Sequence, residues 1–560
     1  MLRTGHLRRL LADMVGASYD SNFNMAEQGE NLVGRILSSA RAGNWEGRVA
    51  LREGARQIRY SELAEQVAKG AAALRGLGVV NGDRVAVYSP DCIDAAVAIL
   101  STMYAGAIAL PVSELSAANE LRNRLNNAEA TVVLVHADLR ANADEISAEL
   151  ESLKHLVTIG AEQDEHGFAS LLEAAAKPYA PATFVGGEEP AILLYSAGAS
   201  TETTEDGLRG VLHPHQTPSR AFASFAKGFL GLCETDRVFS TVRLSTAYGL
   251  GTGLLFPLLA GAETLLMPGQ AHSAQVFDAI KSFEPTVFSA TPSLYGQLAR
   301  DASRTGNTKS LSELRWCIAG AEGMPPKVIA MVRGVLGSNV AVGYGLTEAF
   351  QFVIAGAAKG KRPGNCGQVL SGIEVRIVDD EGKTVGEDEI GTLQLRGANI
   401  IDTYWGSDAT LTEDGWFTTL DRFMVDANKN YYHCGRSDHL FKVGGKWVTP
   451  AEVEQALLAN EAVWECAVIG ADDEDGLIKP FAFIVPNIGQ EPGDALEAEL
   501  RKYVKNELAP YKYPRWIEFV DELPKGPAGV ILRYKLRDRL KQSQSRRVAE
   551  SLANRESKKS

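Results

Sequence analysis

The stretch Gly343-Tyr344-Gly345-Leu346-Thr347-Glu348 follows the short apolar run Ala341–Val342, which is typical of a buried strand. Its glycines allow another backbone or a ligand to approach closely. Tyr344 offers a flat face to a purine, Thr347 a hydroxyl to a phosphate, and Glu348 a carboxylate to Mg²⁺ beside phosphate oxygens. Alone, the stretch also fits an ordinary turn after a strand, so its interpretation depends on the rest of the chain.

Two apolar runs upstream also end in loops that contain glycine or proline. They cover Thr286–Ser289 and Arg315–Ala319. Loops at the carboxyl ends of parallel strands are the usual ligand-binding positions in α/β sheets. We therefore expect ligand-binding residues in the loops that follow these strands.

Closer to the N-terminus, helical patterns alternate with short apolar strands. A helix is predicted over Tyr60–Leu77 and a strand over Arg84–Tyr88; a second helix near Asp91–Ala105 precedes a strand over Ala130–Val135. This alternation predicts an α/β fold, with a mostly parallel sheet and helices on both of its faces.

Toward the C-terminus the pattern changes to β structure. Strands are predicted over Glu374–Val378 and Gly391–Arg396, with a turn at Asp379–Gly382 after the first of them. After Gly435 the sequence predicts a small α+β domain. Its expected elements are a helix over Pro450–Ala459 and strands over Trp464–Ile469 and Pro480–Val485.

The charge and the cysteines exclude several classes of protein. A formal net charge of -13 over 560 residues argues against a nucleic-acid partner, which requires a basic face. The six cysteines are widely spaced and form no C-x-x-C pair, which argues against a zinc site or a disulfide framework. Isolated buried thiols in a reducing cytoplasm are the favoured interpretation.

The most apolar stretch, Ala95–Val112, approaches the length of a membrane span. Gly106 and Pro111 interrupt it, so a buried helix followed by a buried strand is the better interpretation, and we expect no membrane span. The first twenty residues contain three arginines and few acids, a weak likeness to a transit peptide. We favour an N-terminal extension of a cytoplasmic protein.

Two further motifs follow the opening stretch at fixed distances. Gly415-Trp416-Phe417-Thr418-Thr419-Leu420-Asp421 contributes a carboxylate, and Gly435-Arg436-Ser437-Asp438-His439 contributes a guanidinium. Together these groups could grip the two hydroxyls of a ribose. Each motif is weak alone, because Asp–Arg pairs are common on protein surfaces.

In this order the motifs resemble those of the acyl-adenylate-forming superfamily, which contains acyl-CoA synthetases, luciferases and peptide-synthetase adenylation domains. The resemblance covers roughly residues 22–537. Within the superfamily the chain is most similar to benzoate–CoA ligases. Phe239–Pro268, centred on Thr246-Ala247-Tyr248-Gly249-Leu250-Gly251, and the opening Asn22-Phe23-Asn24-Met25-Ala26-Glu27 carry that closer likeness.

The resemblance implies a large α/β domain that includes a β subdomain, and a small mobile α+β domain. The implied divisions are an extension at 1–21, the large domain at 22–435, a hinge at 436–439, the small domain at 440–537 and a polar tail at 538–560. The implied cofactors are ATP or AMP, Mg²⁺ and CoA. The implied partners are a small aromatic carboxylate and CoA or another thiol acceptor.

The same resemblance assigns roles to matching positions. Thr347, Glu348 and Arg209 are implied as catalytic residues, with Glu348 also holding the metal. Asp438 is implied as the hinge. Residues implied to bind the cofactors are Ser196, Gly198, Ser200, Thr201, Tyr344, Gly345, Asp421, Arg436, Lys442, Gly444 and Gly445. An aryl pocket is implied at Ala247, Tyr248, Gly249 and Gly320, although Tyr248 equally fits a packed core aromatic.

The phosphate loop departs from the family pattern. After Tyr195-Ser196-Ala197-Gly198-Ala199-Ser200-Thr201 the chain has extra residues before Gly210, and Arg209 stands where the family has lysine. Such a loop cradles phosphates with backbone N–H groups and hydroxyls. Three acids in the insertion, Glu202, Glu205 and Asp206, add negative charge near an anionic triphosphate. Arginine still binds phosphate, but as a planar fork.

A second departure lies near the C-terminus. The run from Leu523 to Arg537 matches the family except at Val530, where the family has a lysine that contacts the carboxylate and the α-phosphate. A cation about 4 Å from an anion contributes roughly 4 kcal/mol at an effective dielectric constant of about 20. Its loss would slow adenylation on the order of a thousandfold.

Two hypotheses follow. The first is an aryl-carboxylate–CoA ligase that forms an acyl-adenylate with impaired adenylation. The second is a non-catalytic or specialised relative that binds AMP or an acyl-adenylate, or transfers the acyl group to a different acceptor. The altered phosphate loop and Val530 motivate the second hypothesis.

Overall fold

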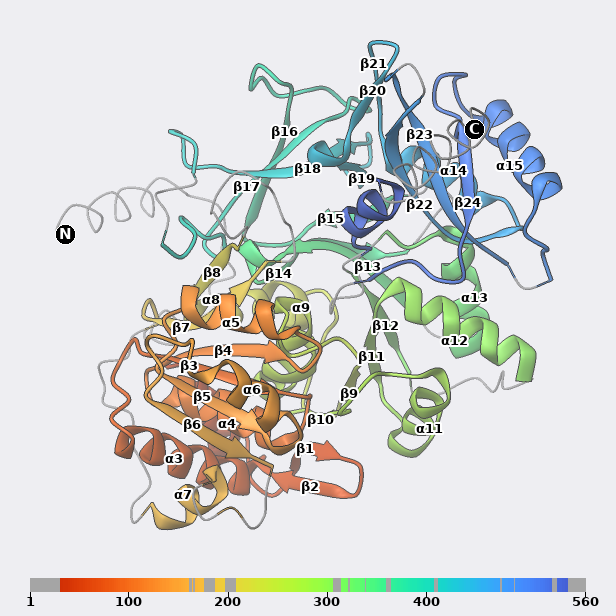
Figure 1. Ribbon diagram of the computed structural model, residues 1–560. Helices are drawn as coiled ribbons and strands as arrows, with labels where there is room; N and C mark the ends of the chain where they lie inside the picture. The colour runs from red at the N-terminus through yellow and green to blue at the C-terminus, as the bar shows by residue number, and fades with distance from the viewer. Residues whose placement is uncertain are drawn as a thin grey trace, which may run out of the picture.

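The computed structural model describes most of the chain as an α/β protein with a smaller domain at its C-terminal end (Figure 1). The described residues are 31–160, 164, 167–175, 187–196, 208–305, 314–320, 323–337, 339–358, 364–406, 411–473, 476–487, 489–525 and 531–541.

A six-stranded sheet occupies the N-terminal part. Its strand order is β6-β5-β3-β4-β7-β8, and all neighbours are parallel except β7 and β8, which are antiparallel. The strands are β3 (Arg84–Ser89), β4 (Ile108–Ser113), β5 (Val132–His136), β6 (His155–Ile159), β7 (Pro190–Tyr195) and β8 (Gly210–Pro214).

Helices cover both faces of this sheet, as the alternating pattern predicts. Val85 and Val87 of β3 point into a core shared with one group of helices, whereas Ala86 and Tyr88 point into a second core on the opposite face. The helices on the first face are α2 (Leu32–Ala42), α3 (Tyr60–Gly76), α4 (Ile93–Tyr104) and α7 (Phe168–Ala174), and those on the second are α5 (Ala118–Asn127) and α6 (Arg140–Ser147).

A thirteen-stranded sheet forms the second layer, in the order β16-β17-β18-β19-β15-β14-β13-β12-β11-β9-β10-β1-β2. Strands β13, β12, β11 and β9 run parallel, so their carboxyl ends meet at one edge. The strands are β1 (Val49–Glu53), β2 (Arg56–Arg59), β9 (Arg237–Ser240), β10 (Glu263–Leu265), β11 (Val287–Ala290), β12 (Trp316–Ala319), β13 (Asn339–Leu346), β14 (Gln351–Ala357), β15 (Asn365–Val369), β16 (Ile373–Val378), β17 (Gly391–Gly397), β18 (Phe417–Val425) and β19 (Tyr431–Arg436).

Short helices and turns connect these strands. They are η2 (Ala137–Leu139), α8 (Gln216–Ala221), η3 (Phe222–Lys227), α9 (Ala247–Leu250), η4 (Gly251–Leu255), α10 (Phe256–Ala260), α11 (Ser273–Phe283), α12 (Pro292–Thr305), α13 (Pro326–Leu336) and η5 (Thr347–Ala349).

The small domain follows the turn η6 (Ser437–His439) and lies at the upper right in Figure 1. Its elements are the hairpin β20 (Phe441–Val443) and β21 (Lys446–Val448), the sheet of β22 (Val463–Asp472), β23 (Ile478–Pro486) and β24 (Trp516–Phe519), and the helices α14 (Pro450–Ala459) and α15 (Asp494–Glu507). Leu536 and Leu540, in helix 533–541, both pack in its core, so that core extends beyond the predicted end at Arg537.

The elements expected from the sequence are confirmed, with ends that differ by a few residues. The apolar stretch Ala95–Val112 divides between α4 and β4, separated by Gly106 at a φ of 81°. Among the described residues, no helix is long and apolar enough to cross a membrane.

Candidate active site

The ribose end of the site is a cluster around Asp421. The hydroxyl of Tyr344, on β13, donates to Asp421 Oδ2 at 2.8 Å. Asp421, on β18, lies opposite Arg436 in the β18–β19 register, with 3.9 Å between Arg436 Nη1 and Asp421 Oδ2. The structure therefore brings together the three residues that the sequence assigned to adenine and ribose, although they are far apart along the chain.

Asp421 has a third neighbour, His433, whose Nε2 lies 2.8 Å from Asp421 Oδ1. The imidazole ring lies nearly parallel to the Tyr344 ring, with 6.0 Å between the ring centroids. Burial raises the pKa of Asp421, but His433, the Arg436 charge and the Tyr344 hydroxyl outweigh it and hold that pKa below its usual value. A carboxylate has about four lone-pair positions, so an ionised Asp421 retains acceptor capacity for ribose hydroxyls.

The phosphate end of the site is centred on Glu348, in the turn η5 that directly follows β13. Its side chain is buried, and its Oε1 accepts a hydrogen bond of 2.8 Å from the Tyr404 hydroxyl. Burial raises the pKa of Glu348 above its usual value, although the Tyr404 hydrogen bond and the Arg209 charge oppose that shift. Ionised Glu348 is therefore costly until another cation arrives.

The base of the phosphate loop lies beside Glu348. Ser196 directly follows β7 and Arg209 directly precedes β8; the Ser196 amide donates to the Arg209 carbonyl at 3.0 Å. The Arg209 guanidinium lies over the Tyr404 ring, 5.5 Å from its centroid. Three loop residues predicted to bind phosphate, Gly198, Ser200 and Thr201, lie outside the described residues.

Gly345, near the end of β13, and Thr347, the first residue of η5, precede Glu348. The Thr347 carbonyl lies 2.8 Å from His213 Nε2, and burial lowers the pKa of His213 to about 4, so the imidazole is neutral and donates. A Cβ atom on Gly345 would lie 2.2 Å from the Gln351 carbonyl oxygen. Only glycine fits there, because β14 folds back directly against this part of β13.

The residues predicted to line an aryl pocket gather at the carboxyl ends of β11 and β12. Tyr248 and Gly320 are neighbours, since a Cβ on Gly320 would lie 3.4 Å from the Tyr248 ring and 2.6 Å from Phe352. The Tyr248 hydroxyl donates to the Ile318 carbonyl at 2.9 Å, so its ring is held against the core while remaining partly exposed. Ala247 and Gly249 are buried beside it in α9.

The small-domain residues predicted to face a thiol lie elsewhere. Gly444 and Gly445 form the two-residue turn of the β20–β21 hairpin, both at positive φ, and Lys442 lies over the Trp447 ring at 4.6 Å. Figure 1 shows this hairpin at the top of the molecule, away from the ends of β11–β13. The backbone of Asp438 lies in η6, between β19 and the hairpin.

The chain matches two models of known protein families. The family model described as AMP-binding enzyme matches residues 39–405, and that described as AMP-binding enzyme C-terminal domain matches residues 452–529. The chain belongs to the AMP-binding enzyme family. The resemblance inferred from the motifs is therefore confirmed.

Individual relatives of this AMP-binding enzyme point to one class of reaction. A benzoate–CoA ligase of Thauera aromatica is 34% identical over 515 residues, covering 91% of this chain and 95% of the relative. The anthranilate CoA ligase AuaEII in complex with anthranoyl-AMP is 33% identical with a TM-score of 0.85, covering 92% and 98% of the two chains. A benzoate CoA ligase from Burkholderia xenovorans LB400 is 30% identical with a TM-score of 0.82, covering 91% and 100%. This chain is an acid–thiol ligase, of the acyl-CoA synthetase type.

Sequence reasoning missed three side chains of the AMP-binding enzyme's site: Tyr404, His433 and His213. The spacing of His433 gave no signal, because a register shift in the β18–β19 pair brings it onto Asp421. Tyr404 lies in the connection between β17 and β18, where no hydrophobic periodicity predicts which way a side chain points. His213 lies on a strand that directly follows the phosphate loop, which is the one signal that could have identified it.

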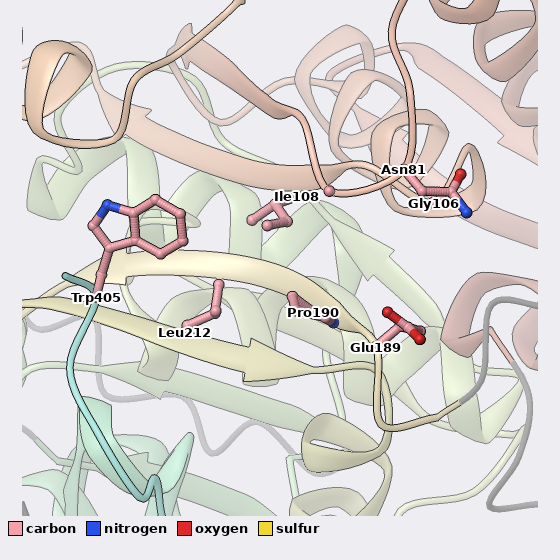
Figure 2. A pocket seen from close by; sticks show the side chains of 8 residues that line it. Asn81, Gly106, Ile108, Glu189, Pro190, Leu212 and Trp405 are labelled. Carbon is pink, nitrogen blue, oxygen red and sulfur yellow. The ribbon is translucent and has the colours of Figure 1, made fainter. Parts of the chain in front are cut away.

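A separate cavity of about 290 Å³ lies between the first residues of β4 and β7 and Trp405 (Figure 2). Ile108 and Pro190, the first residues of β4 and β7, line it, so it opens at the amino ends of these strands. Figure 2 shows Trp405 on its wall, and the Trp405 amide donates to the Gly210 carbonyl at 2.8 Å. Since Tyr344, Asp421 and Glu348 do not line it, this cavity is separate from the candidate active site.

The donor set fits a magnesium ion that is shared with a nucleotide. Among the described residues, no group of three or more His, Cys, Asp or Glu side chains could hold a metal by itself. Mg²⁺ is usually held by one or two carboxylates together with substrate phosphates. Glu348, which is buried and whose pKa is raised despite the charges of Arg209 and Arg436, fits that arrangement.

Proposed function

We propose that this enzyme converts an aromatic carboxylate, ATP and CoA to the aryl-CoA, AMP and pyrophosphate through an acyl-adenylate. The observation that carries the proposal is the Tyr344–Asp421–Arg436 cluster. Glu348 directly follows the strand that carries Tyr344, and Tyr248 lies against Gly320 after the neighbouring strand β12. The benzoate and anthranilate ligases similar to this chain support an aromatic acid of benzoate size.

In the proposed first half-reaction, a carboxylate oxygen of the acid attacks the α-phosphorus of ATP, and the bond to the β-phosphate oxygen breaks to release pyrophosphate. Asp421 and Arg436 hold the ribose, and Tyr344 lies beside the adenine. Arg209 and the Thr347 hydroxyl bind phosphate oxygens. Glu348 would hold Mg²⁺, which would supply positive charge beside the phosphate oxygens. These groups orient ATP so that the attack is in line.

In the proposed second half-reaction, the CoA sulfur attacks the acyl carbon, AMP leaves, and the thiol proton passes to solvent. The hairpin residues Lys442, Gly444 and Gly445 lie away from the adenylate site in the present arrangement. We propose that the small domain, 440–537, turns about the hinge at Asp438 and brings the hairpin to the large domain, 22–435. A few residues at a hinge can absorb such a change.

We further propose that adenylation is slow. Val530, outside the described residues, replaces the family's lysine, and three acids enlarge the phosphate loop. Val530→Lys should therefore raise acid-dependent ATP–pyrophosphate exchange, by up to about a thousandfold. An unchanged exchange rate would show that this position does not limit the reaction.

The free cysteines of the described residues suit a reducing compartment, so we place the enzyme in the cytoplasm.

A second candidate function rests on the same departures. A specialised relative would bind AMP or an acyl-adenylate, or use another acceptor, without activating free acids. Its support is the altered phosphate loop together with Val530. It retains every contact at the ribose end, so nucleotide binding alone does not discriminate between the two functions.

One pair of reactions discriminates between them. The first contains the protein with benzoate, ATP, Mg²⁺ and CoA; the second contains ready-made benzoyl-adenylate and CoA. Benzoyl-CoA in both supports the ligase, and product only from the adenylate assigns the defect to adenylation. AMP binding without product in either reaction supports the specialised relative.

A further inference from the structure

One contact between the two domains lies on helix α12 of the large domain. The Trp464 ring of the small domain lies directly on Gly296 in the middle of that helix. A Cβ atom on Gly296 would lie 2.7 Å from Trp464 Cη2, which is closer than real atoms approach. The ring therefore occupies space that any other residue at position 296 would fill.

Glycine is a poor residue for that position on local grounds. In a helix interior it has more backbone freedom to lose on folding than alanine, and it buries no side chain. The close approach of Trp464 supplies a tertiary reason for it. The glycine therefore leaves room on α12 for the Trp464 ring of the small domain.

Polar contacts surround the tryptophan. The Arg300 guanidinium, one turn along α12 from Gly296, lies 3.3 Å from the Trp464 ring centroid, a cation–π contact. Glu465 Oε1 accepts from the Ser293 hydroxyl at 3.2 Å and pairs with Lys525 Nζ at 2.7 Å. Glu465 thereby joins a large-domain helix to a small-domain loop.

That loop contains Val530, which stands where the family has a lysine. Lys525 pairs with Ile531 across an isolated antiparallel bridge, and Val530 lies between them in sequence. The contacts of Trp464 and Glu465 therefore hold the base of this loop against the large domain. The β20–β21 hairpin lies at the opposite side of the small domain.

We propose that Trp464 and Glu465 of the small domain, with Ser293, Gly296 and Arg300 of α12, form a latch that holds the adenylation arrangement. The proposal rests on the two half-reactions of the proposed function. Trp464 and Glu465 are positioning residues, which act by holding Lys525, and with it Ile531, near α12 and touch no substrate. The latch must open before the hairpin residues can reach the acyl-adenylate.

The strength of the contacts suits a reversible latch. Ser293, Arg300 and Glu465 are partly exposed, so water replaces their partners readily when the domains separate. A cation–π pair and one charge-assisted hydrogen bond together stabilise the adenylation arrangement enough to change the ratio of the two domain arrangements about tenfold. It is too weak to prevent the domain from turning.

Gly296→Ala is the sharpest variant, because it adds one methyl group under the tryptophan while favouring the helix itself. Gly334→Ala is its matched control, since Gly334 lies within α13 and a Cβ there meets nothing within 4 Å. Trp464→Ala and Glu465→Gln remove the two halves of the latch separately. Circular dichroism and thermal unfolding verify that each variant is folded.

The domain arrangement is measured directly with the full chain. The exposed Cys233 is first replaced by serine, and spin labels are attached to cysteines introduced at Ala330 of α13 and Glu499 of α15. Electron–electron distance measurement should give one dominant distance in the parent protein. Gly296→Ala and Trp464→Ala should shift or broaden it, and Gly334→Ala should not.

The half-reactions provide the second readout. Gly296→Ala, Trp464→Ala and Glu465→Gln should lower acid-dependent ATP–pyrophosphate exchange about tenfold. Transfer from ready-made benzoyl-adenylate to CoA should be unchanged or faster in the same variants. A purely structural role would lower both rates together and would overturn the proposal.

The two proposals fail in distinguishable ways. Unchanged distances in Gly296→Ala and Trp464→Ala would overturn the latch, even in a protein with full ligase activity. A parent protein inactive in both half-reactions would overturn the proposed function. A latch-dependent distance in that protein would still support the domain contact.

Discussion

The two ends of the candidate site hold carboxylates that are equally buried but whose pKa values shift in opposite directions. At the ribose end, Asp421 lies between His433, Tyr344 and Arg436, and its pKa is lowered. At the phosphate end, Glu348 has a neutral hydroxyl as its nearest partner, and its pKa is raised. The partners, and not the degree of burial, decide the charge of each group.

This difference assigns a task to each end. Asp421 is an anion before any ligand arrives, so it can accept ribose hydroxyls at once. Glu348 becomes favourable as an anion only when a cation joins it, which couples its charge to the arrival of Mg²⁺ with a nucleotide. The ribose end is therefore preorganised, and the phosphate end is completed by its ligand.

The largest effect should come from removing the anion at the ribose end. Asp421→Asn loses charge-assisted hydrogen bonds worth about 1.5–3 kcal/mol each, so AMP affinity should fall roughly 100- to 1000-fold. Isothermal titration calorimetry with AMP measures this affinity. Asp414→Asn, which changes an exposed ion pair with Arg376, is the control and should leave affinity unchanged.

Changing the phosphate end should separate metal-dependent from metal-independent binding. Glu348→Gln should lower ATP binding in Mg²⁺ by about 100-fold, because one charged metal ligand is lost. AMP binding without Mg²⁺ should change less than about threefold. Equal losses of both affinities would contradict the assignment of Glu348 to the metal.

The stabilities of these two variants should move in opposite directions with pH. Since the Glu348 pKa is raised on folding, the native protein loses stability as pH rises through that pKa, and Glu348→Gln escapes this loss. Since the Asp421 pKa is lowered, its contribution is present above its usual pKa and is lost as pH falls toward the lower value.

Thermal unfolding between about pH 3 and pH 8 therefore tests the comparison. Relative to the parent, Glu348→Gln should be stabilised most at pH 8. Asp421→Asn should be destabilised at pH 8, by about 1–3 kcal/mol, with a deficit that shrinks only below about pH 4. Shifts of the same sign in both variants would show that the two carboxylates do not differ.

The smallest effect should come from His433, which acts on Asp421 and not on the ligand. His433→Phe removes one hydrogen bond to the carboxylate, so AMP affinity should fall about 3- to 10-fold. His433→Gln, which keeps a donor, should restore most of the affinity. A rise in affinity would mean that the imidazole competes with ribose for Asp421.

Much of this site was accessible from the sequence, because its motifs are local and their order is specific. Tyr344, Asp421, Arg436, Glu348 and Arg209 were predicted together. The structure joins the first three, and it places Arg209 over the ring of Tyr404, whose hydroxyl donates to Glu348. His433 and Tyr404 were not predicted, because a strand irregularity and an irregular connection direct them.

The sequence by itself determined the family, the alternation of helices and strands, and the residues available for nucleotide chemistry. Periodicity and short motifs encode these features locally. Only the tertiary structure decided which carboxylate is held as an anion, which side chains support the site, and that Trp464 rests on Gly296. Those features depend on burial and on contacts between residues distant in the chain, which no local pattern records.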